Sequence, residues 1–285
     1  MSGQEYDRGV CAGFVTFNPD VQLFSSCMDA LQRQVAKMYV YDNGSRNNQE
    51  VRRICEQYGA ELYGSSANEG ISKALNELCH HALVDGYHWM LTMDQDSLSD
   101  RWMVSSLVQY VGEDVGIVAP RIEFWSKGIL VTSTKRCCHD VDEITACITS
   151  GSLTNLSAWN HVGGFDEWMF IDHVDNDFCI RLRLAGYRIL RVHAGVLSQR
   201  AGEMGYMSLP FGKKILLPHY SDSRHYYSCR NTVYYLRKYR SHIRFIHELG
   251  VFVYSIVIRL LFEQNRFQTM RSTVKAVSAG LRKEI

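Results

Sequence analysis

The sequence predicts an α/β protein with a mostly parallel sheet flanked by helices and a helical extension at its C-terminal end. Through the first half of the chain, short apolar runs alternate with amphipathic segments, and this alternation is typical of parallel strands joined by crossover helices. After a Gly- and Pro-bearing segment at residues 201–220, the chain becomes aromatic and basic. Its 285 residues are 46% hydrophobic, which is enough for one large core. We therefore expect a sheet domain at residues 1–205 and a helical extension at 206–285.

The elements of the first half are expected in regular alternation. Buried strands are predicted at residues 10–17, 38–41, 60–63, 89–93 and 115–119. Helices are predicted between and after them, at about residues 21–34, 49–58, 71–82 and 102–110. The third helix carries Ile71, Leu75, Leu78 and Ala82 at helical spacing, which indicates one buried face.

The pattern changes after residue 120. Strands are predicted at residues 129–134, 144–149 and 187–192. A helix at about 176–185 is expected to end at Gly186, because glycine favours the backbone conformation that closes a helix. The Gly- and Pro-bearing segment at 201–220 is expected to be a loop.

Cysteine content and charge narrow the classes of function. The nine cysteines form no CxxC pair, so a disulfide framework or a zinc site is not expected. The polar start, Met1 to Arg8, has no apolar core of a secretory signal, and we expect a cytoplasmic protein. From Arg224 to Ile285, twelve Lys or Arg stand against three Glu, a net charge of +9 beside −8 for the rest. Such a tail favours an anionic partner.

Polar side chains follow four predicted strands. They stand in the runs Thr16-Phe17-Asn18-Pro19, Tyr41-Asp42-Asn43-Gly44-Ser45, Ser65 to Gly70, and Asp94-Gln95-Asp96-Ser97. Ligands of a parallel sheet bind beyond the carboxyl ends of its strands, so these runs are expected at one binding edge. Each run alone is also explained by turn formation or helix capping.

Asp94 and Asp96 form the sharpest of these motifs. They follow the apolar run Trp89 to Met93, and two carboxylates one residue apart at a strand end can both reach Mg²⁺ or Mn²⁺. Such a cation can neutralise the charge of a leaving diphosphate. The alternative is a helix cap with surface carboxylates before Arg101. Neither GxGxxG nor GxxxxGK[ST] occurs, so metal and an arginine would have to hold the phosphates, and Arg230 is the candidate.

A second group of carboxylates precedes the helix predicted at about 176–185. Asp177 and Arg181 stand four residues apart and can pair on the helix surface, and Asp175 lies where negative charge stabilises a helix start. Helix capping does not explain Asp172, which follows the apolar Met169-Phe170-Ile171. A carboxylate in that setting can take a proton from an acceptor hydroxyl.

Together these motifs resemble glycosyltransferase family 2, which has the GT-A fold, and within it the bacterial rhamnosyltransferases of cell-surface polysaccharide synthesis. The resemblance runs in order from about residue 10 to residue 240. Its segments are Val15 to Pro19, Val40 to Ser45, Asn68 to Asn76, Met93 to Ser97, Thr149 to Ser152, Gly163 to Glu167, Phe170-Ile171-Asp172 with Val174-Asp175, and Arg230-Asn231. The DQDS run at 94–97 and the FID-VD pattern suggest the rhamnosyl branch.

The resemblance implies an inverting transfer of L-rhamnose from dTDP-rhamnose to a glycan acceptor, which is expected to be lipid-linked in O-antigen, capsule or cell-wall synthesis. By resemblance, Asp94 and Asp96 bind a divalent metal, Asp96 more directly. Asp175 is the general base and Asp172 lies beside it, while Gly151 and Ser152 border the sugar and the acceptor. The nucleotide-sugar site is expected to comprise Thr16, Asn18, Asp42, Asn43, Asn68, Gly70, Ala74, Asp94, Gln95 and Arg230.

One departure concerns the third metal ligand. Rhamnosyltransferases often carry a histidine after the last strand, and here Gln199 occupies that place while His193 lies earlier. Two alternatives stay open: a family 2 enzyme that uses a UDP-hexose, and a nucleotide-sugar-binding protein without turnover. Asp94, Asp96 and Asp175 speak against the second. Nucleic-acid binding is not expected, because carboxylates at strand ends fit an RNA- or DNA-reading surface poorly.

The basic tail allows two interpretations. Leu249 to Phe262 is an apolar run of about fourteen residues interrupted by Arg259, and a membrane-spanning helix needs roughly twenty apolar residues. The run could lie in a membrane interface, at the inner face of the plasma membrane, with Lys and Arg near anionic headgroups. Alternatively, it is one of a pair of helices packed on the catalytic domain.

Overall fold

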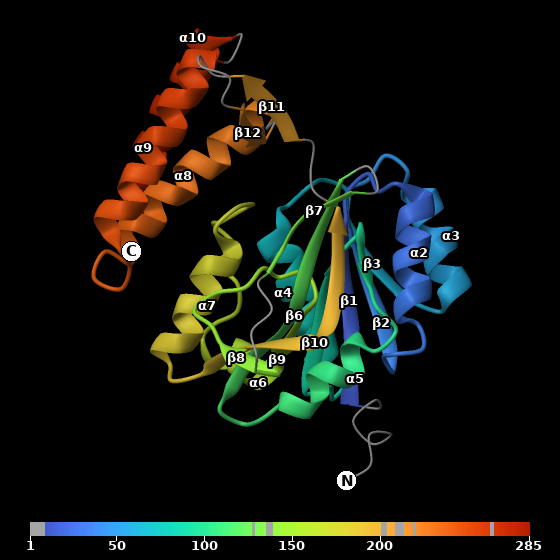
Figure 1. The fold of residues 1–285 in the computed structure, drawn as a ribbon. Coiled ribbons are helices and arrows are strands. Elements are labelled where there is room, and N and C mark those ends of the chain that lie inside the picture. Colours follow the sequence, from blue (N-terminus) through green and yellow to red (C-terminus); the bar gives the residue numbers. More distant parts are fainter. Residues whose placement is uncertain are drawn as a thin grey trace. The chain divides into compact units, whose positions relative to one another are not determined.

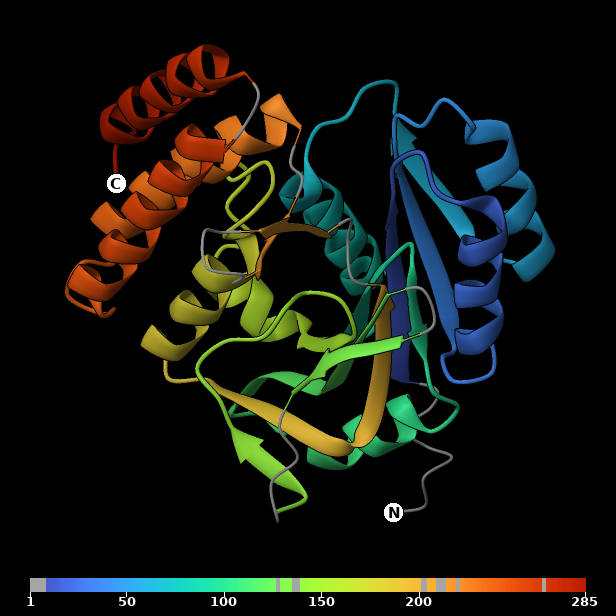
Figure 2. The same cartoon turned by 45° about the horizontal axis from the view of Figure 1, so that its top comes forward.

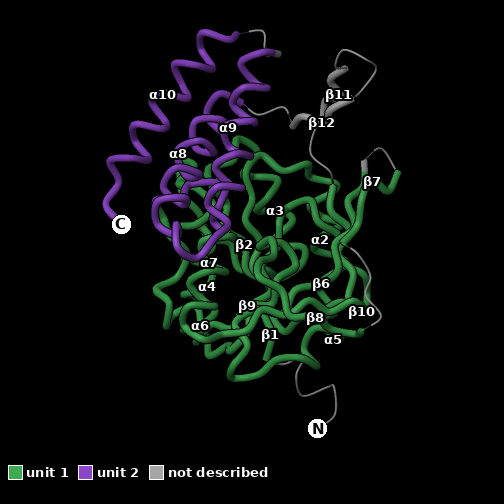
Figure 3. Tube along the Cα trace, turned by 60° about the vertical axis from the view of Figure 1, so that its left-hand side comes forward, with its two compact units in different colours: residues 1–167, 175–202 green, residues 168–174, 203–285 purple. Residues whose placement is uncertain are grey.

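The computed structural model describes residues 9–126, 129–134, 139–200, 204–208, 214–218, 221–262 and 265–285 (Figure 1). The chain forms two compact units (Figure 3). The sheet unit comprises residues 1–167 and 175–202, and the helical unit comprises residues 168–174 and 203–285. The predicted domain boundary between residues 205 and 206 stays a prediction.

The first half of the sheet is parallel. Strands β1 (Val10–Thr16), β2 (Lys37–Asn43), β3 (Glu61–Ser65) and β4 (Trp89–Asp94) lie in the order β3-β2-β1-β4. Helices α2 (Val21–Leu31), α3 (Asn48–Tyr58) and α4 (Ile71–Val84) connect them. Figures 1 and 2 both show α2 and α3 along one face of these strands. On that face Phe24 and Ile54 pack into one core with Phe14 and Val40.

The second half of the sheet is mixed. Its strands are β5 (Ser97–Ser99), β6 (Val115–Ser126), β7 (Ile129–Ser133), β8 (Val141–Glu143), β9 (Ser152–Asn155) and β10 (Arg188–Arg200). Strand β9 pairs antiparallel with β4 and β6, whereas β6 and β10 pair in parallel. Short helices α5 (Met103–Leu107) and α6 (Leu156–His161), the 3₁₀ turn Val108–Tyr110 and helix α7 (Val174–Leu184) complete this region. The predicted α/β fold class is confirmed.

Two predicted elements are wrong. Residues 144–149 form no strand, because side chains hold their backbone instead: the Thr92 hydroxyl donates to the carbonyl of Thr149 at 2.5 Å, and the Ser152 hydroxyl donates to that of Ile148 at 2.6 Å. Residues 201–220 are not simply a loop, since β11 (Met204–Ser208) and β12 (Lys214–Pro218) pair as a hairpin. The rest of that segment lies outside the described residues.

The strand predicted at residues 187–192 is much longer than expected. A register shift between Val192 and Val196 bends β10, as bulges do, and the strand then continues to Arg200 beside β5. This extension brings Gln199 to the carboxyl end of β4, because Gln199 pairs with Ser97 in the short strand that follows Asp96.

The helical unit consists mainly of α8 (Asp222–Lys238), α9 (Phe245–Phe262) and α10 (Arg266–Arg282). Helix α10 packs closely on α8, where a Cβ at Gly280 would come within 2.6 Å of the Arg230 carbonyl oxygen. Arg237 ties the two helices by donating to the carbonyls of Gly280 and Lys283, both at 2.9 Å. None of the described helices combines the length and the apolar character needed to cross a membrane.

Candidate active site of the sheet unit

The carboxyl ends of β1 and β2 are joined through a buried aspartate. Asp42 accepts hydrogen bonds from the hydroxyls of Thr16, at 3.0 Å, and Ser45, at 2.5 Å. The Ser45 hydroxyl in turn accepts from the backbone N–H of Asn18 at 2.8 Å, and Asn18 has a positive φ of 48°. The structure therefore brings together the three residues predicted to hold the nucleoside.

Asn43 fixes the loop that follows β3. Its side chain donates to the carbonyl of Gly70 at 3.0 Å and accepts from the N–H of Glu69 at 2.8 Å. Asn68 accepts from the N–H of Gly70 at 3.0 Å. Gly70 has φ of 93° just before α4, and Ala74 lies buried one turn later. Asn43 is only 3% exposed. This predicted nucleotide-site residue therefore acts on the loop, which it holds through these buried hydrogen bonds.

Gln95 links the end of β4 to the end of β1. It accepts from the N–H of Phe17 at 2.7 Å and donates to the Phe17 carbonyl at 3.3 Å. Asp94 is held from the other side, since its N–H donates to the Ser150 hydroxyl at 3.1 Å. Hydrogen bonds to the Gln95 side chain and to the Asp94 backbone thus hold the segment that carries the carboxylate pair.

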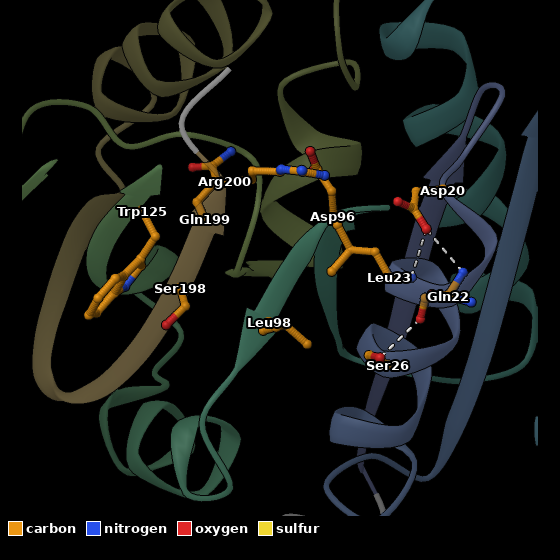
Figure 4. A pocket seen from close by; sticks show the side chains of 10 residues that line it. All are labelled: Asp20, Gln22, Leu23, Ser26, Asp96, Leu98, Trp125, Ser198, Gln199 and Arg200. Carbon is orange, nitrogen blue, oxygen red and sulfur yellow. Dashed lines mark hydrogen bonds between the residues drawn. The ribbon is translucent and has the colours of Figure 1, made fainter. Parts of the chain in front are cut away.

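Asp96 lies in a cavity of about 540 Å³ (Figure 4). The cavity is lined by Asp20, Gln22, Leu23, Ser26, Asp96, Leu98, Trp125, Ser198, Gln199 and Arg200. Burial raises the pKa of the Asp96 carboxyl above its usual value, and the nearby Arg200 guanidinium partly opposes this rise. A carboxylate that is partly desolvated in this way is stabilised by a bound cation.

Gln199 lies beside the carboxylate pair at this end of the sheet. Sequence reasoning notes Gln199 only because it stands where rhamnosyltransferases often carry a histidine. Its Nε2 donates to Oδ2 of Asp94 at 3.1 Å, while its Oε1 is buried without a hydrogen-bond partner. Within the described residues no group of three His, Cys, Asp or Glu could hold a metal ion. Asp94, Asp96 and the Gln199 amide are nevertheless hard oxygen donors of the kind Mg²⁺ and Mn²⁺ accept, and they fit such a cation together with water or phosphate.

The cavity that contains Asp96 is also lined by an arginine, Arg200, that sequence reasoning did not single out. Figure 4 shows the Arg200 side chain extending toward Asp96. Arg230 belongs to the helical unit, where it lies 3.9 Å from the ring centre of Trp168, donates to the Trp168 carbonyl and bonds Asn231 at 3.0 Å. The signal for Arg200 was its place directly after Gln199 at the end of β10.

Gly151 and Ser152 lie in the interior of the sheet unit. Gly151 has φ of 76°, and a Cβ there would come within 2.9 Å of Leu197, so another residue would be strained at this position. Ser152 is 2% exposed and its hydroxyl is bonded to Ile148. Their predicted contact with sugar and acceptor stays a prediction, and Ser150 and Cys147 of the same turn line the neighbouring cavity instead.

Asp175 stands in the first turn of α7, as predicted, and lines that neighbouring cavity. Its Oδ1 accepts from the N–H of Asn176 at 2.9 Å. Two residues on, Asp177 pairs with Arg181 at 2.8 Å, but Asp177 is 0% exposed and Arg181 18% exposed, so the pair is not on the helix surface as expected. Buried Asp177 anchors α7 and leaves Asp175 half-exposed at the helix start.

Asp172 belongs to the helical unit. Asp172 and His173 both have φ of 65°, an uncommon conformation for residues other than glycine, which needs support from its surroundings. Asn231 supplies that support by donating to the carbonyls of Ile171 and Asp172 at 2.7 and 3.1 Å. Oδ1 of Asp172 pairs with Arg224 at 3.1 Å, while its Oδ2 is buried without a hydrogen-bond partner.

Part of the sheet unit matches a known protein family. Residues 14–151 match the family model Glycosyl transferase family 2. This segment is a glycosyl transferase family 2 domain. The predicted resemblance is confirmed, and the domain contains the strand ends that carry Thr16, Asp42 and the Asp94–Asp96 pair. Asp175 and the helical unit lie beyond the matched residues.

A relative extends the resemblance over nearly the whole chain. The chain is 27% identical, over 293 aligned residues, to the dTDP-rhamnosyl transferase RfbF of Shigella flexneri. The alignment covers 97% of this chain and 96% of the relative. The family 2 domain and this relative support a glycosyltransferase with a nucleotide-sugar donor.

Solved structures show the same fold. S. aureus TarS 1–349 in complex with UDP-GlcNAc superposes with a TM-score of 0.60 at 12% identity, over 95% of this chain and 81% of that one. GalNAc-T7 with UDP, GalNAc and Mn²⁺ gives 0.60 at 11% identity, over 87% of this chain and 54% of that one. At such low identity the likeness concerns the fold, and it confirms the predicted GT-A architecture.

Proposed function

We propose that the chain is an inverting rhamnosyltransferase that moves L-rhamnose from dTDP-rhamnose to a glycan acceptor. The observation that carries the donor sugar is the alignment with a dTDP-rhamnosyl transferase over 97% of the chain. The Asp42 network, with Thr16 and Asn18, is proposed to hold the nucleoside. The loop at 68–70 and Ala74, held by Asn43, would line the nucleotide.

Asp94, Asp96 and Gln199 would hold Mg²⁺ or Mn²⁺, which would neutralise charge on the departing diphosphate. Ser150 and Gln95 hold the segment at residues 94–96 in place, since Ser150 accepts a hydrogen bond from the Asp94 N–H and Gln95 accepts one from the Phe17 N–H. Arg200 would add a second positive charge toward the phosphates, since Arg fits phosphate oxygens through two parallel N–H donors.

Asp175 is proposed to take the proton from the acceptor hydroxyl as that oxygen attacks the anomeric carbon. A half-exposed carboxylate at the edge of a cavity can reach a bound hydroxyl and accept its proton. Asp172, held by Asn231 and Arg224, is proposed to bind the acceptor. Acceptor contacts of Gly151 and Ser152 belong to the same proposal.

A donor screen tests the proposed sugar. Purified chain with Mg²⁺ or Mn²⁺ would be given dTDP-rhamnose, UDP-glucose, UDP-galactose and UDP-N-acetylglucosamine, and release of free nucleoside diphosphate would be followed. We expect release from dTDP-rhamnose and tighter calorimetric binding of dTDP than of UDP. Clearly tighter UDP binding would instead favour a UDP-hexose transferase. Two solved structures of the same fold contain UDP or UDP-GlcNAc, so this alternative is tested as well. Binding without turnover of any donor would leave a nucleotide-sugar-binding protein.

We further propose that the acceptor is lipid-linked and that α9 and α10 lie against an anionic membrane. Ile246, Phe267 and Val274 are 79%, 76% and 64% exposed, and the segment from Arg224 onward has a net charge of +9. Each basic residue near such a surface contributes about 1 kcal/mol. The other side of α10 packs on α8 through Thr273 and Gly280, so packing uses only part of that helix.

Sedimentation with vesicles tests the membrane contact. We expect binding to anionic vesicles, absent with neutral vesicles, that weakens at high salt and is lost when Arg271, Lys275, Arg282 and Lys283 are made neutral. If the protein binds neither kind of vesicle, α9 and α10 serve only to pack within the protein and the membrane proposal fails. The cytoplasmic location expected from the sequence stays a prediction.

A further inference from the structure

A second cavity in the sheet unit opens beside Asp175. It has a volume of about 420 Å³ and is lined by Ala119, Pro120, Ile122, Phe124, Thr134, Ala146, Cys147, Ile148, Ser150, Asp175, Asn176 and Arg191. One part of the wall is apolar and the other presents a carboxylate, an amide, hydroxyls and a guanidinium. This size and this mixture are typical of small-molecule sites, which usually enclose roughly 300–1,000 Å³.

Arg191 is the unexplained group in this wall. It lies half-buried on β10, and among the described residues its Nε is buried without a hydrogen-bond partner and no carboxylate oxygen comes within ion-pair distance. A partly buried guanidinium normally gains charged or hydrogen-bonding partners, because losing its hydration is otherwise unfavourable. The missing partner is therefore expected to come from a ligand.

Two acidic groups near Arg191 in the fold, Asp142 and Asp175, already accept hydrogen bonds from other residues. Asp142 stands opposite Arg191 in the pairing of β8 with β10, and its carboxylate accepts from Nε2 of His193 at 2.7 Å. Asp175, in the same cavity wall, accepts from the N–H of Asn176. The charges of Asp175 and Arg191 both act on the nearby Cys147. A hydrogen bond from Cys179 lowers the pKa of the Cys147 thiol, the Asp175 charge raises this pKa, and the Arg191 charge lowers it.

We propose that this cavity binds an acceptor sugar that carries an oxyanion, either a carboxylate or a phosphate, and that Arg191 pairs with this group. The planar guanidinium offers parallel N–H donors that match both kinds of oxyanion. With the anion at Arg191, a hydroxyl of the same or the adjoining sugar can point to Asp175. The proposal rests on the assignment of Asp175 as the base in the proposed function, and it names the charge class of the acceptor.

Binding of simple sugars tests the proposal without turnover. Saturation-transfer NMR and competition titrations would use the full chain, in the absence of donor, with methyl β-D-glucuronide, α-D-glucose 1-phosphate and methyl β-D-glucoside. We expect at least one charged probe to bind about tenfold more tightly than the neutral glucoside, since a charge-assisted hydrogen bond has that worth. The glucuronide and the phosphate identify which oxyanion is preferred.

Arg191→Gln should remove this preference, and Arg191→Lys should restore it only in part, because lysine keeps the charge but not the planar donor pair. Arg188→Gln is the matched control, since Arg188 lies on the same strand but pairs with Asp114 and Glu143 outside the cavity. Thermal melting of each variant reports whether it is folded.

The proposal is overturned by equal binding of charged and neutral probes, by no binding of either charged probe, or by a charge preference that survives in Arg191→Gln. Titration with dTDP and UDP separates this site from the donor site. If Arg191→Gln weakens nucleotide binding instead, Arg191 belongs to the donor and the acceptor proposal fails. Any of these failures, beside normal turnover of dTDP-rhamnose by the wild type, would leave the proposed function standing.

Discussion

Gln199 donates a hydrogen bond to Asp94 at 3.1 Å across 105 positions of the chain. This contact joins the end of β10 to the end of β4, where the carboxylate pair stands. Because the Gln199 Oε1 is buried without a partner, rotation of the amide in the presence of a cation would exchange a donor to Asp94 for a ligand to the metal. We therefore expect Gln199 to link the orientation of Asp94 to occupancy of the site by a cation.

Gln199→Ala is expected to weaken Mn²⁺ binding about tenfold, since loss of a group that orients a metal ligand typically costs that much. Gln199→His should retain affinity, because imidazole is itself a ligand. The measurement is the concentration of free Mn²⁺ by electron paramagnetic resonance, with dTDP or UDP present. Ser198→Ala in the same cavity is the control, and unchanged affinity in Gln199→Ala would refute the role.

Asp96→Ala is expected to abolish transfer while the chain stays folded. Removing a cation that stabilises leaving-group charge raises the barrier by several kcal/mol. Nucleoside diphosphate release and thermal melting would be measured together, with chelator-treated wild type for comparison. Normal turnover in both the variant and the chelated protein would show that the reaction needs no metal at this site.

Asp175→Asn is expected to lose roughly 10²-fold or more in rate, the usual contribution of a positioned base, with donor binding largely kept. Asp172→Asn should mainly raise the acceptor concentration needed for half-maximal rate. Kinetics with varied acceptor and calorimetry with donor distinguish these effects. An inactive Asp172→Asn beside an active Asp175→Asn would exchange the two roles.

Arg200→Gln is expected to weaken binding of a nucleoside diphosphate about tenfold, the worth of one charge-assisted contact, while binding of the nucleoside alone stays unchanged. Arg230→Gln should instead lower the melting temperature, because Arg230 stacks on Trp168 and bonds its carbonyl. Calorimetry with dTDP and thymidine compares the two variants. If Arg230→Gln alone loses diphosphate affinity, the sequence-based choice of Arg230 is the right one.

Gly280→Ala is expected to destabilise the protein by about 1–3 kcal/mol, a usual result of overpacking. Its Cβ would come within 2.6 Å of the Arg230 carbonyl oxygen and 2.9 Å of the Val233 Cβ, so α10 would have to move away from α8. Gly250→Ala in α9 meets nothing within 4 Å and should stabilise by about 0.8–1 kcal/mol through helix propensity. Chemical denaturation compares both with wild type, and a neutral Gly280→Ala would contradict the packing.

Local patterns predicted much of the catalytic half. Alternation of apolar runs located β1, β2 and β4, because each strand is short, buried on both faces and followed by polar residues. The same patterns failed at residues 144–149, where Thr92 and Ser152 hold the backbone through side-chain hydrogen bonds. Whether an apolar run pairs as a strand depends on such partners, and one of them, Thr92, lies 57 positions away in the sequence.

The sequence by itself determined the class of the fold, the carboxylate pair at Asp94 and Asp96, and the family to which the strand-end motifs belong. Those features are local, since they follow from residues within one strand and the turn after it. Tertiary structure decided which distant groups meet them: Gln199 at Asp94, Arg200 in the cavity of Asp96, and Arg191 in the cavity of Asp175. Gln199 and Arg200 reach their places because β10 bends between Val192 and Val196 and continues between β6 and β5, and these pairing partners lie far away in the sequence.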